Sequence, residues 1–481
     1  MRMMQPRMDQ APGEQTSPRT ILVSRLDGLG DAVLGTTLLS GLHARWPEAR
    51  ILLLVRPKFI GLHQILPAWV QVISLGFDSY APVQGKEGQI ADLLREVSRD
   101  LHPDLMILSE YNRAWAAELL AMLCGVPRVM AFENCTGLNV ANRPIREQLG
   151  LPKPQGWELV KTSYEWPEVK KYHAMLLALG IDPAPHLPIV HMQAEDRNAA
   201  AAFWSDSGFP PGKAPLVLFP SSGDGLLRSL PAGAWARWAA HLAQRRDVVL
   251  LGSETDAPAL EAIAAAGLSQ EIKRLILLGN RPGLLAGVLE MASGYIGADT
   301  GPMHIAATLN RPTLGVFGGG TIGRFGAGSD PRRFLPVGKR AAAIRMPLGC
   351  FGCGWECAFD QRLCLTHMPI DQVIASGDVF VSEYLDGGEN PDPLSPRIFD
   401  LQPPAELPLT LLGPIMRQHQ QFLKLNHDIT EHHDYLERIL ADMTRHNIAR
   451  DNAIQHINNV LTEMTKQNNA RDAAIAKLGR W

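Results

Sequence analysis

Two short segments, one in each half of the chain, contain the residue types best suited to acid–base chemistry and to binding an anion. The first runs from Arg25 to Asp31 and follows the apolar residues Ile21 to Val23. The second runs from Gly297 to His304. Each pattern is typical of a strand, a glycine-containing turn and the first turn of a helix, where backbone N–H groups and the positive end of the helix dipole face an anion. Two such turns predict two nucleotide-binding α/β domains that face a shared cleft.

Short apolar runs and amphipathic stretches alternate around both segments. This alternation predicts βα units, and therefore parallel sheets that are covered by helices on both faces. We expect strands at 21–24, 50–55, 104–109, 215–219, 247–252 and 295–297, and helices at 31–45 and 235–244.

The chain of 481 residues is longer than one hydrophobic core usually supports, so we expect two globular domains with extensions. Pro and polar residues between 182 and 215 indicate the boundary between them. The predicted divisions are a disordered N-terminal tail (1–19), a first Rossmann-like domain (20–195), a second Rossmann-like domain (196–385), a Pro-rich linker (386–414) and a C-terminal coiled coil (415–481).

The overall charge and hydropathy exclude several classes of protein. A formal net charge of −3 gives no electrostatic reason to bind nucleic acid. The N-terminal residues lack the apolar core of a signal peptide, and the longest aliphatic runs are far shorter than the roughly 20 residues that a membrane span needs. We therefore expect a cytoplasmic protein that is soluble or at most peripheral at the inner membrane.

The C-terminal segment repeats its own pattern. The residues from Leu440 recur from Leu461, three heptads later, and neither Pro nor Gly occurs from Ile415 to Leu478. If Leu440 is taken as position a of the heptad, Asn447 and Asn468 also fall at a positions, where buried Asn favours a dimer. The repeat predicts a homo-oligomer held by the coiled coil, and the alternative is a helix that folds back on the globular domains.

The two segments with candidate chemistry resemble the motifs of one family, the ADP-heptose:lipopolysaccharide heptosyltransferases. The sequence Arg-Leu-Asp-Gly-Leu-Gly-Asp within 21–56, with Pro-Glu-Ala-Arg-Ile after the predicted helix, resembles the amino-terminal motif. The sequence within 297–318 resembles the carboxy-terminal signature Asp-Thr-Gly-x-x-His-x-Ala-Ala. The resemblance covers about residues 20 to 380 and implies an inverting glycosyltransferase of the GT-B architecture, with the donor in the second domain, the acceptor mainly in the first, and no cofactor required for catalysis.

Inverting transfer needs a base for the acceptor hydroxyl proton and positive groups for the departing diphosphate. Asp31 matches the base position of the family. Its alternative role is that of an N-cap, a common use of Asp at the start of a helix.

The resemblance also implies a set of donor-binding residues. Thr300, Gly301, Pro302 and His304 match the diphosphate-binding turn, and Asp299 would face the sugar hydroxyls. Ser221 and Ser222 match a hydroxyl pair used on phosphate, Arg228 stands where the family usually has Lys, and Glu254 matches a carboxylate that binds the ribose. Leu230 replaces an aromatic residue of the family pattern, and two extra residues precede Arg228, which leaves the identity of the donor open. Simpler alternatives are that His304 packs inside the protein and that Glu254 is a solvated residue at a helix start.

Three cationic residues are candidates for binding the acceptor. Arg56 and Lys58 follow one predicted strand and Arg113 follows another, so all three would lie at the edge where α/β sheets bind ligands. Together they would suit an anionic glycan or lipid-linked acceptor, although each alone could be a surface charge.

Four of the six cysteines, Cys350, Cys353, Cys357 and Cys364, lie close together. Four thiolates could hold zinc or iron in tetrahedral geometry, in a structural role, and some members of the family carry a cysteine-rich insert at this place. The alternative is a loop with reduced or adventitiously paired thiols.

The resulting expectation is transfer of a heptose or related sugar from an ADP-activated donor to a lipopolysaccharide or other surface-glycan precursor. The nearest alternative is a relative that glycosylates protein, as the autotransporter heptosyltransferases do. A non-catalytic nucleotide-sugar-binding scaffold built on the coiled coil is a second alternative, and a nucleotide-sugar epimerase of similar shape is a third, which the paired motifs disfavour.

Overall fold

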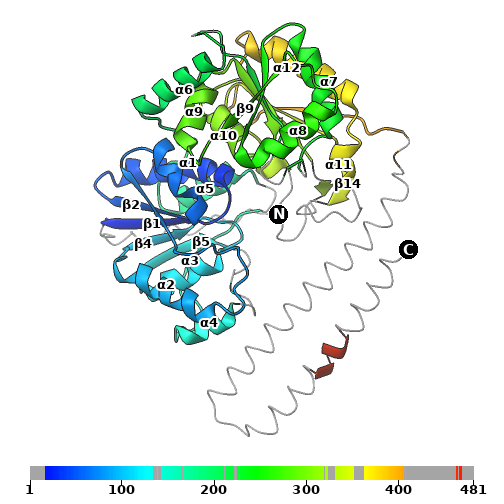
Figure 1. Ribbon diagram of the computed structural model, residues 1–481. Helices are drawn as coiled ribbons and strands as arrows, with labels where there is room; N and C mark the ends of the chain where they lie inside the picture. The colour runs from blue at the N-terminus through cyan, green and yellow to red at the C-terminus, as the bar shows by residue number, and fades with distance from the viewer. Residues whose placement is uncertain are drawn as a thin grey trace, which may run out of the picture. The chain divides into compact units, whose positions relative to one another are not determined.

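A computed structural model describes residues 17–133, 138, 142–163, 166–210, 212–221, 225–226, 228–318, 320–322, 331–351, 362–405, 407, 462–463 and 465–467. Within 17–407 the chain forms two lobes, each built on a parallel sheet (Figure 1), and both belong to the same compact unit. The lobes confirm the predicted α/β class with two Rossmann-like sheets. The chain passes from one lobe to the other between 178 and 194. The helix before this point, α5 (Glu168–Ala178), packs on α1 (Leu29–Arg45) of the first lobe, and the helix after it, α6 (Ala194–Asp206), packs on α9 (Pro282–Met291) of the second.

The first lobe has a six-stranded sheet in the order β3-β2-β1-β4-β5-β6. Its strands are β1 (Thr20–Arg25), β2 (Arg50–Val55), β3 (Val70–Ser74), β4 (Leu105–Leu108), β5 (Arg128–Phe132) and β6 (Glu158–Val160). Its helices are α1 (Leu29–Arg45), η1 (Pro57–Ile65), α2 (Glu87–Arg99), α3 (Trp115–Leu123), α4 (Arg143–Gln148) and α5 (Glu168–Ala178). The strand order reverses between β1 and β4, and ligands of open α/β sheets bind at such a switch point.

Alternate residues of the central strand β1 face opposite layers of helices. Ile21 and Val23 pack in the core formed with α1 and α5, whereas Leu22 packs in the core formed with α2 and α3. Figure 1 shows these two helical layers on either side of the first sheet. A strand that is buried on both faces has to be apolar throughout, and this explains why β1 and β2 read as continuous aliphatic runs.

The second lobe has a seven-stranded sheet in the order β15-β13-β11-β10-β7-β8-β9, with a small parallel pair, β12 and β14, beside it. Its strands are β7 (Leu216–Phe219), β8 (Val248–Ser253), β9 (Lys273–Leu277), β10 (Gly294–Ala298), β11 (Thr313–Phe317), β12 (Gly320–Ile322), β13 (Ala341–Arg345), β14 (Leu348–Phe351) and β15 (Arg397–Asp400). Its helices are α6 (Ala194–Asp206), α7 (Ala232–Ala243), η2 (Glu254–Asp256), α8 (Ala257–Ala265), α9 (Pro282–Met291), α10 (Gly301–Thr308), η3 (Pro331–Arg333), α11 (Leu363–Thr366), α12 (Ile370–Phe380) and η4 (Val381–Leu385). The switch point lies between β7 and β10, which are the strands that precede the predicted donor residues.

The Pro-rich segment differs from its prediction as a linker. Within 386–414, β15 pairs in parallel with β13, and Leu401 and Leu407 are buried in the core of the second lobe. The prolines lie before and after the strand, where no ladder hydrogen bond is lost, so the segment can supply an edge strand. Its described part therefore belongs to the second lobe.

Two predicted extensions lie mainly outside the described residues. Of the tail 1–19, only 17–19 is described. Of the coiled coil 415–481, only 462–463 and 465–467 are described, and these residues are helical, with Lys466 Nζ 3.5 Å from a Glu463 carboxylate oxygen. The coiled coil and its oligomer therefore stay predictions. Across the described ranges, no helix is both long and apolar enough to cross a bilayer.

Candidate active site

The two predicted motifs meet where α1 of the first lobe packs against α10 of the second. A Cβ atom on Gly30 would lie 2.6 Å from Cδ2 of His304, and one on Gly301 would lie 2.7 Å from the side chain of Leu29. Both distances are too short for a real contact, so these two positions need glycine for the helix starts to approach each other. The proposed base and the proposed donor turn therefore share one site.

Asp31 is the third residue of α1, and the protein restrains both of its oxygens. Oδ2 accepts a hydrogen bond from the backbone N–H of Gly28 at 3.1 Å, and Oδ1 lies 3.4 Å from Nη2 of Arg25. The side chain keeps 23% of its surface exposed. Burial raises the pKa of the carboxyl and Arg25 opposes the rise, so the group is a stronger base than an ordinary Asp. Asp31 thus caps the helix backbone at Gly28 and still presents a carboxylate to the site.

Arg25, which was not among the predicted site residues, organises this side of the site. Its guanidinium is 2% exposed at the end of β1. Nη1 donates to the carbonyl oxygen of Ser109 at 2.5 Å, and Nη2 donates to Asp27 Oδ2 at 2.7 Å. A buried Arg shared by two carboxylates fixes the geometry of the turn that carries Asp31. The sequence signal that could have indicated this role is that Arg25 is the first residue of the motif that ends at Asp31.

Glu110, which follows β4, is a second residue of the site that was not predicted. It is 2% exposed and accepts hydrogen bonds from Ser24 Oγ at 2.6 Å and from the backbone N–H of Leu26 at 2.7 Å. It therefore ties the end of β1 to the loop after β4 across the switch point. An acidic residue two positions after a fully apolar strand could have indicated this role.

The donor turn begins with Thr300, the N-cap of α10. Thr300 has extended backbone angles, makes no side-chain cap hydrogen bond, and places its hydroxyl 3.3 Å from the Tyr295 hydroxyl. Pro302, at the second helical position, has no N–H to satisfy, while Gly301 and the residues after Pro302 present theirs. The start of α10 therefore has the geometry of an anion-binding turn.

Asp299 precedes this turn, and the charges around it connect the proposed donor and base residues. Burial raises the pKa of its carboxyl to about 7, Arg228 lowers it and Asp31 raises it. The charges of Arg228 and Asp31 therefore both act on Asp299, although the three segments lie far apart in the sequence.

The raised pKa of Asp299 predicts a pH-dependent effect of Asp299→Asn on stability. Between pH 4 and 7 the folded protein holds a proton that the unfolded chain has released, so stability falls as pH rises through this window. The amide cannot ionise, so the variant should melt about 3–6 °C above the wild type at pH 8 and close to it at pH 4.5, by scanning calorimetry. Exposed Asp206→Asn is the control and should show no such difference. An equal difference in melting temperature between the variant and the wild type at both pH values would contradict the burial of Asp299 as the cause of its raised pKa.

His304 has the features of a packing residue. It is 3% exposed, its ring lies against Gly30, and burial lowers its pKa to about 4. The imidazole is therefore neutral at physiological pH and offers no positive charge to a diphosphate. Within the described structure its Nδ1 is buried and has no hydrogen-bond partner.

The remaining donor candidates, Ser221, Ser222 and Glu254, differ in their burial and hydrogen-bond partners. Ser221 is fully buried and its hydroxyl donates to a carboxylate oxygen of Asp256, so this hydroxyl fixes the loop after β7 and does not face solvent. Ser222 lies outside the described residues. Glu254 is exposed at the end of β8 and accepts a hydrogen bond from the N–H of Gly279 at 3.3 Å, which places its carboxylate at the ligand-binding edge of the sheet.

The three acceptor candidates have separate partners. Arg56 donates two hydrogen bonds to the Asp78 carboxylate, at 2.8 and 2.6 Å, and its guanidinium lies 4.6 Å from the ring centre of Tyr80, which is 59% exposed. The carbonyl oxygen of Lys58 accepts a hydrogen bond from the Asn280 side chain of the second lobe at 2.6 Å.

Arg113 is paired with a buried carboxylate of the first lobe. Its Nε lies 2.8 Å from a carboxylate oxygen of the fully buried Glu118, and its Nη1 donates to the carbonyl oxygen of Phe132 at 2.8 Å. This ion pair gives Arg113 a structural role in the described lobe, and Arg56 with Tyr80 is the better candidate for a ligand surface.

The four-cysteine prediction lies largely outside the described residues. Cys353 and Cys357 are not described, and of Cys350 only the backbone, in β14, is. Cys364 lies on α11, is 7% exposed and packs in the core of the second lobe. Among the described residues, no group of three or more His, Cys, Asp or Glu side chains is arranged to hold a metal ion.

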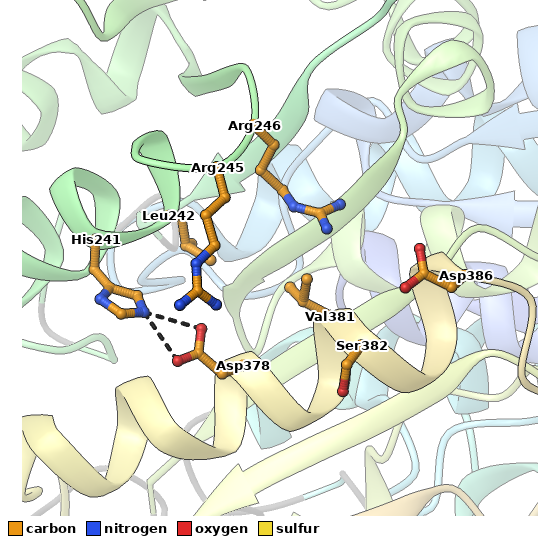
Figure 2. Close-up of a pocket in the computed structure, with 8 residues that line it drawn as sticks. All are labelled: His241, Leu242, Arg245, Arg246, Asp378, Val381, Ser382 and Asp386. Atoms are coloured by element: carbon orange, nitrogen blue, oxygen red, sulfur yellow. Dashed lines mark hydrogen bonds and ion pairs between the residues drawn. The ribbon is translucent and has the colours of Figure 1, made fainter.

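A separate hollow of about 140 Å³ lies between the end of α7 and the segment formed by α12 and η4 (Figure 2). It is bordered by the hydrogen bond between His241 Nε2 and Asp378 Oδ1, at 2.9 Å, and by Arg245 and Arg246. None of the predicted site residues lines it. It is distinct from the site at the junction of α1 and α10.

Two lobes built on parallel α/β sheets, with the start of α1 in contact with the start of α10, define a protein of the GT-B-like class. Residues 110–357 match the family described as glycosyltransferase family 9 (heptosyltransferase). The chain belongs to this family and is a glycosyltransferase, as the resemblance of its two motifs predicted.

Solved structures agree on the fold. A family 9 glycosyltransferase from Veillonella parvula aligns at a TM-score of 0.60 and 18% identity, covering 76% of this chain and 97% of that one. The ADP-heptose lipopolysaccharide heptosyltransferase II of E. coli aligns at a TM-score of 0.51 and 18% identity, covering 76% and 98%. No curated protein sequence matches the chain.

Proposed function

We propose that this glycosyltransferase moves a heptose, or a related sugar, from an ADP-activated donor to a lipopolysaccharide or other surface-glycan precursor, with inversion at the anomeric carbon. The observation that carries the proposal is the contact between the start of α1, with Asp31, and the start of α10, with Thr300 and Gly301. A base and an anion-binding turn at one junction are the two parts that inverting transfer requires.

In the proposed reaction Asp31 takes the proton of the acceptor hydroxyl as its oxygen attacks the anomeric carbon. The bond from that carbon to the diphosphate oxygen breaks, and the negative charge passes to the leaving ADP. The N–H groups at the start of α10 and the guanidinium of Arg228 would stabilise this charge, which lets the reaction proceed without a metal ion. The raised pKa of Asp31 supports its role as a base, since a more basic carboxylate takes the proton more readily.

Donor recognition is proposed for two carboxylates of the second lobe. Asp299, next to the turn, would accept hydrogen bonds from the sugar hydroxyls, and exposed Glu254, at the end of β8, would accept from the ribose. We propose an anionic glycan or lipid-linked acceptor that lies over the first lobe beside Arg56 and exposed Tyr80, where a cation and an aromatic ring are stacked.

Binding and transfer measurements on the purified full-length protein test the proposal. In a thermal-shift screen ADP-sugars should raise the melting temperature more than UDP- or GDP-sugars at equal concentration, because a ligand stabilises the state that it binds. ADP-heptose should then label a lipopolysaccharide precursor. Preference for UDP or GDP would contradict the donor assignment, label on protein alone would favour the protein-glycosylating alternative, and binding without transfer would favour the scaffold.

Two further assignments remain proposals drawn from the sequence. The heptad repeat of 415–481 supports a homo-oligomer held by the C-terminal coiled coil, and the four clustered cysteines support a structural zinc or iron ion. Neither is needed for the proposed chemistry at Asp31.

A further inference from the structure

A buried cluster of charged side chains, to which the proposed reaction assigns no role, lies beneath the turn that carries Asp31. Its members are Arg25, Glu168, Lys171 and Arg333, whose side chains are 2%, 1%, 0% and 7% exposed. Charged residues are rarely this buried unless they are paired, because burying an unpaired charge costs free energy. The charges of these four side chains must therefore be compensated by neighbouring groups.

Glu168, the first residue of α5, is the centre of the cluster. Its Oε1 accepts hydrogen bonds from Lys171 Nζ at 2.6 Å and from Arg333 Nη2 and Nε at 2.6 and 2.9 Å. Burial alone would raise the pKa of this carboxyl, but Arg333, Lys171 and Arg25 together lower it to about 2. Glu168 is therefore ionised throughout the physiological range and binds two cations at once.

Aromatic rings connect this ion pair to the turn that carries Asp31. The ring of Tyr172 lies 5.3 Å from the Arg25 guanidinium, and its hydroxyl lies 3.4 Å from Glu168 Oε2. The ring of Tyr111 lies 4.2 Å from Lys171 Nζ and 5.2 Å from the Arg333 guanidinium. A continuous set of packed and hydrogen-bonded groups thus runs from Arg333 through Glu168 and Tyr172 to Arg25, which lies 3.4 Å from Asp31.

The cluster joins the two lobes. Arg25, Glu168 and Lys171 belong to the first lobe, whereas Arg333 ends η3, between β12 and β13 of the second. Arg333 is held by its shape as well as its charge, since two of its nitrogens bind one oxygen while its plane lies against Tyr111 and, at 4.8 Å, against Phe334. Lys could keep the charge but could not reproduce this fork and stacking.

We propose that Arg333 is a positioning residue that docks the second lobe on Glu168 and thereby holds Arg25, and through it the carboxylate of Asp31, in the orientation for transfer. The inference rests on the proposed function of Asp31 as the base. It adds that a residue of the second lobe, Arg333, helps to orient the proposed base Asp31, which belongs to the first lobe. Separation of the lobes would therefore disarm the base as well as displace the donor.

The charges also predict how the pH profile depends on Arg333. Burial raises the pKa of Asp31, Arg25 lowers it, Glu168 raises it and Arg333 lowers it. The charged and titratable groups coupled to Asp31 are Arg25 and Asp27 from the first motif, Tyr80 from the loop after β3, Glu168 and Tyr172 from α5, and Asp299 and Arg333 from the second lobe. The neutral ring of His304 lies against Gly30, the residue before Asp31. Without Arg333 the negative charge of Glu168 acts on Asp31 with less compensation, which raises the pKa of Asp31. The acidic limb of the pH profile of kcat should therefore move to higher pH by about half a unit to one unit.

Three variants of the full-length protein test the inference with ADP-heptose as donor. Arg333→Met should lower kcat at least about tenfold, change the donor KM less than about threefold, and move the acidic limb upward. Arg333→Lys should keep the limb near its wild-type position yet lose most of kcat, because it keeps the charge without the fork. Arg128→Met removes an exposed arginine pair with Glu158 in the first lobe and should leave kcat within about twofold.

Amide hydrogen exchange gives a readout that does not need activity. Arg333→Met should speed exchange about tenfold or more in peptides covering 25–35 and 168–178, and Arg128→Met should not. If the wild type transfers no sugar but these peptides respond, the docking stands and the proposed function fails. A normal pH profile and kcat in Arg333→Met, full activity in Arg333→Lys, or unchanged exchange in these peptides would overturn the positioning role.

Discussion

Replacing Asp31 with Asn is expected to lower the turnover of sugar transfer about 10²- to 10⁴-fold while ADP affinity stays nearly unchanged. The amide can still accept the hydrogen bond from Gly28, so the start of α1 keeps its cap, but it cannot take a proton from the acceptor. ADP binding should persist because the proposed diphosphate contacts belong to the second lobe. Single-turnover kinetics and calorimetric titration with ADP measure the two effects separately.

Asp31→Ala provides the comparison that separates base from cap. It should lose turnover to the same extent as Asp31→Asn and should also lose stability, about 0.5–2 kcal/mol, because the Gly28 N–H loses its partner. Turnover near the wild-type value in the Asn variant would show that Asp31 serves only the helix, and the proposed mechanism would then be wrong.

The elements around the two motifs could be predicted because local sequence determines them. The strands β1, β2, β7, β8 and β10 and the helices α1 and α7 lie within a few residues of their predicted ranges. Fully buried parallel strands are apolar at every position, and this signal does not depend on distant residues. The edge strand β15 lacks that signal, because it is only partly buried and flanked by proline.

Side-chain roles were predictable only where the partner lies nearby in the sequence. Asp31 was assigned from the family motif, and its partners Gly28 and Arg25 lie only three and six positions before it. Ser221 was expected to face phosphate, but its hydroxyl is taken by Asp256, and Arg113 was expected to face an acceptor, but it is paired with Glu118. Such pairings form only after the fold places the two residues together, and a single sequence does not contain them.

The burial of charge is the clearest example of what the sequence could not reveal. Glu168 and Arg333 are ordinary charged residues in the sequence, separated by 165 positions, yet in the structure they form one buried ion pair between the lobes. A charge pattern of this kind is usually read as a solvated surface. The fold is therefore more predictable than the electrostatics of its site, because apolar patterns are local and charge pairing is not.

Replacing Arg228 with Ala is expected to weaken ADP binding about 10- to 150-fold, the equivalent of about 1.5–3 kcal/mol for a charge-assisted hydrogen bond. The guanidinium would contact phosphate in both donor and product, so the loss should appear in the ADP dissociation constant by calorimetry and not only in the rate. Arg228→Lys should recover part of the affinity, since it keeps the charge without the planar fork. Arg237→Ala, which removes an exposed pair with Asp371, is the control.

The same variant should change the titration of Asp299, which supplies a check that needs no ligand. Burial raises the pKa of that carboxyl and Arg228 lowers it, so removing the guanidinium should raise it further above 7. The pH window in which stability falls should therefore extend upward in Arg228→Ala, and it should disappear again when Asp299→Asn is added. An unchanged ADP affinity together with an unchanged pH dependence would place Arg228 outside the site.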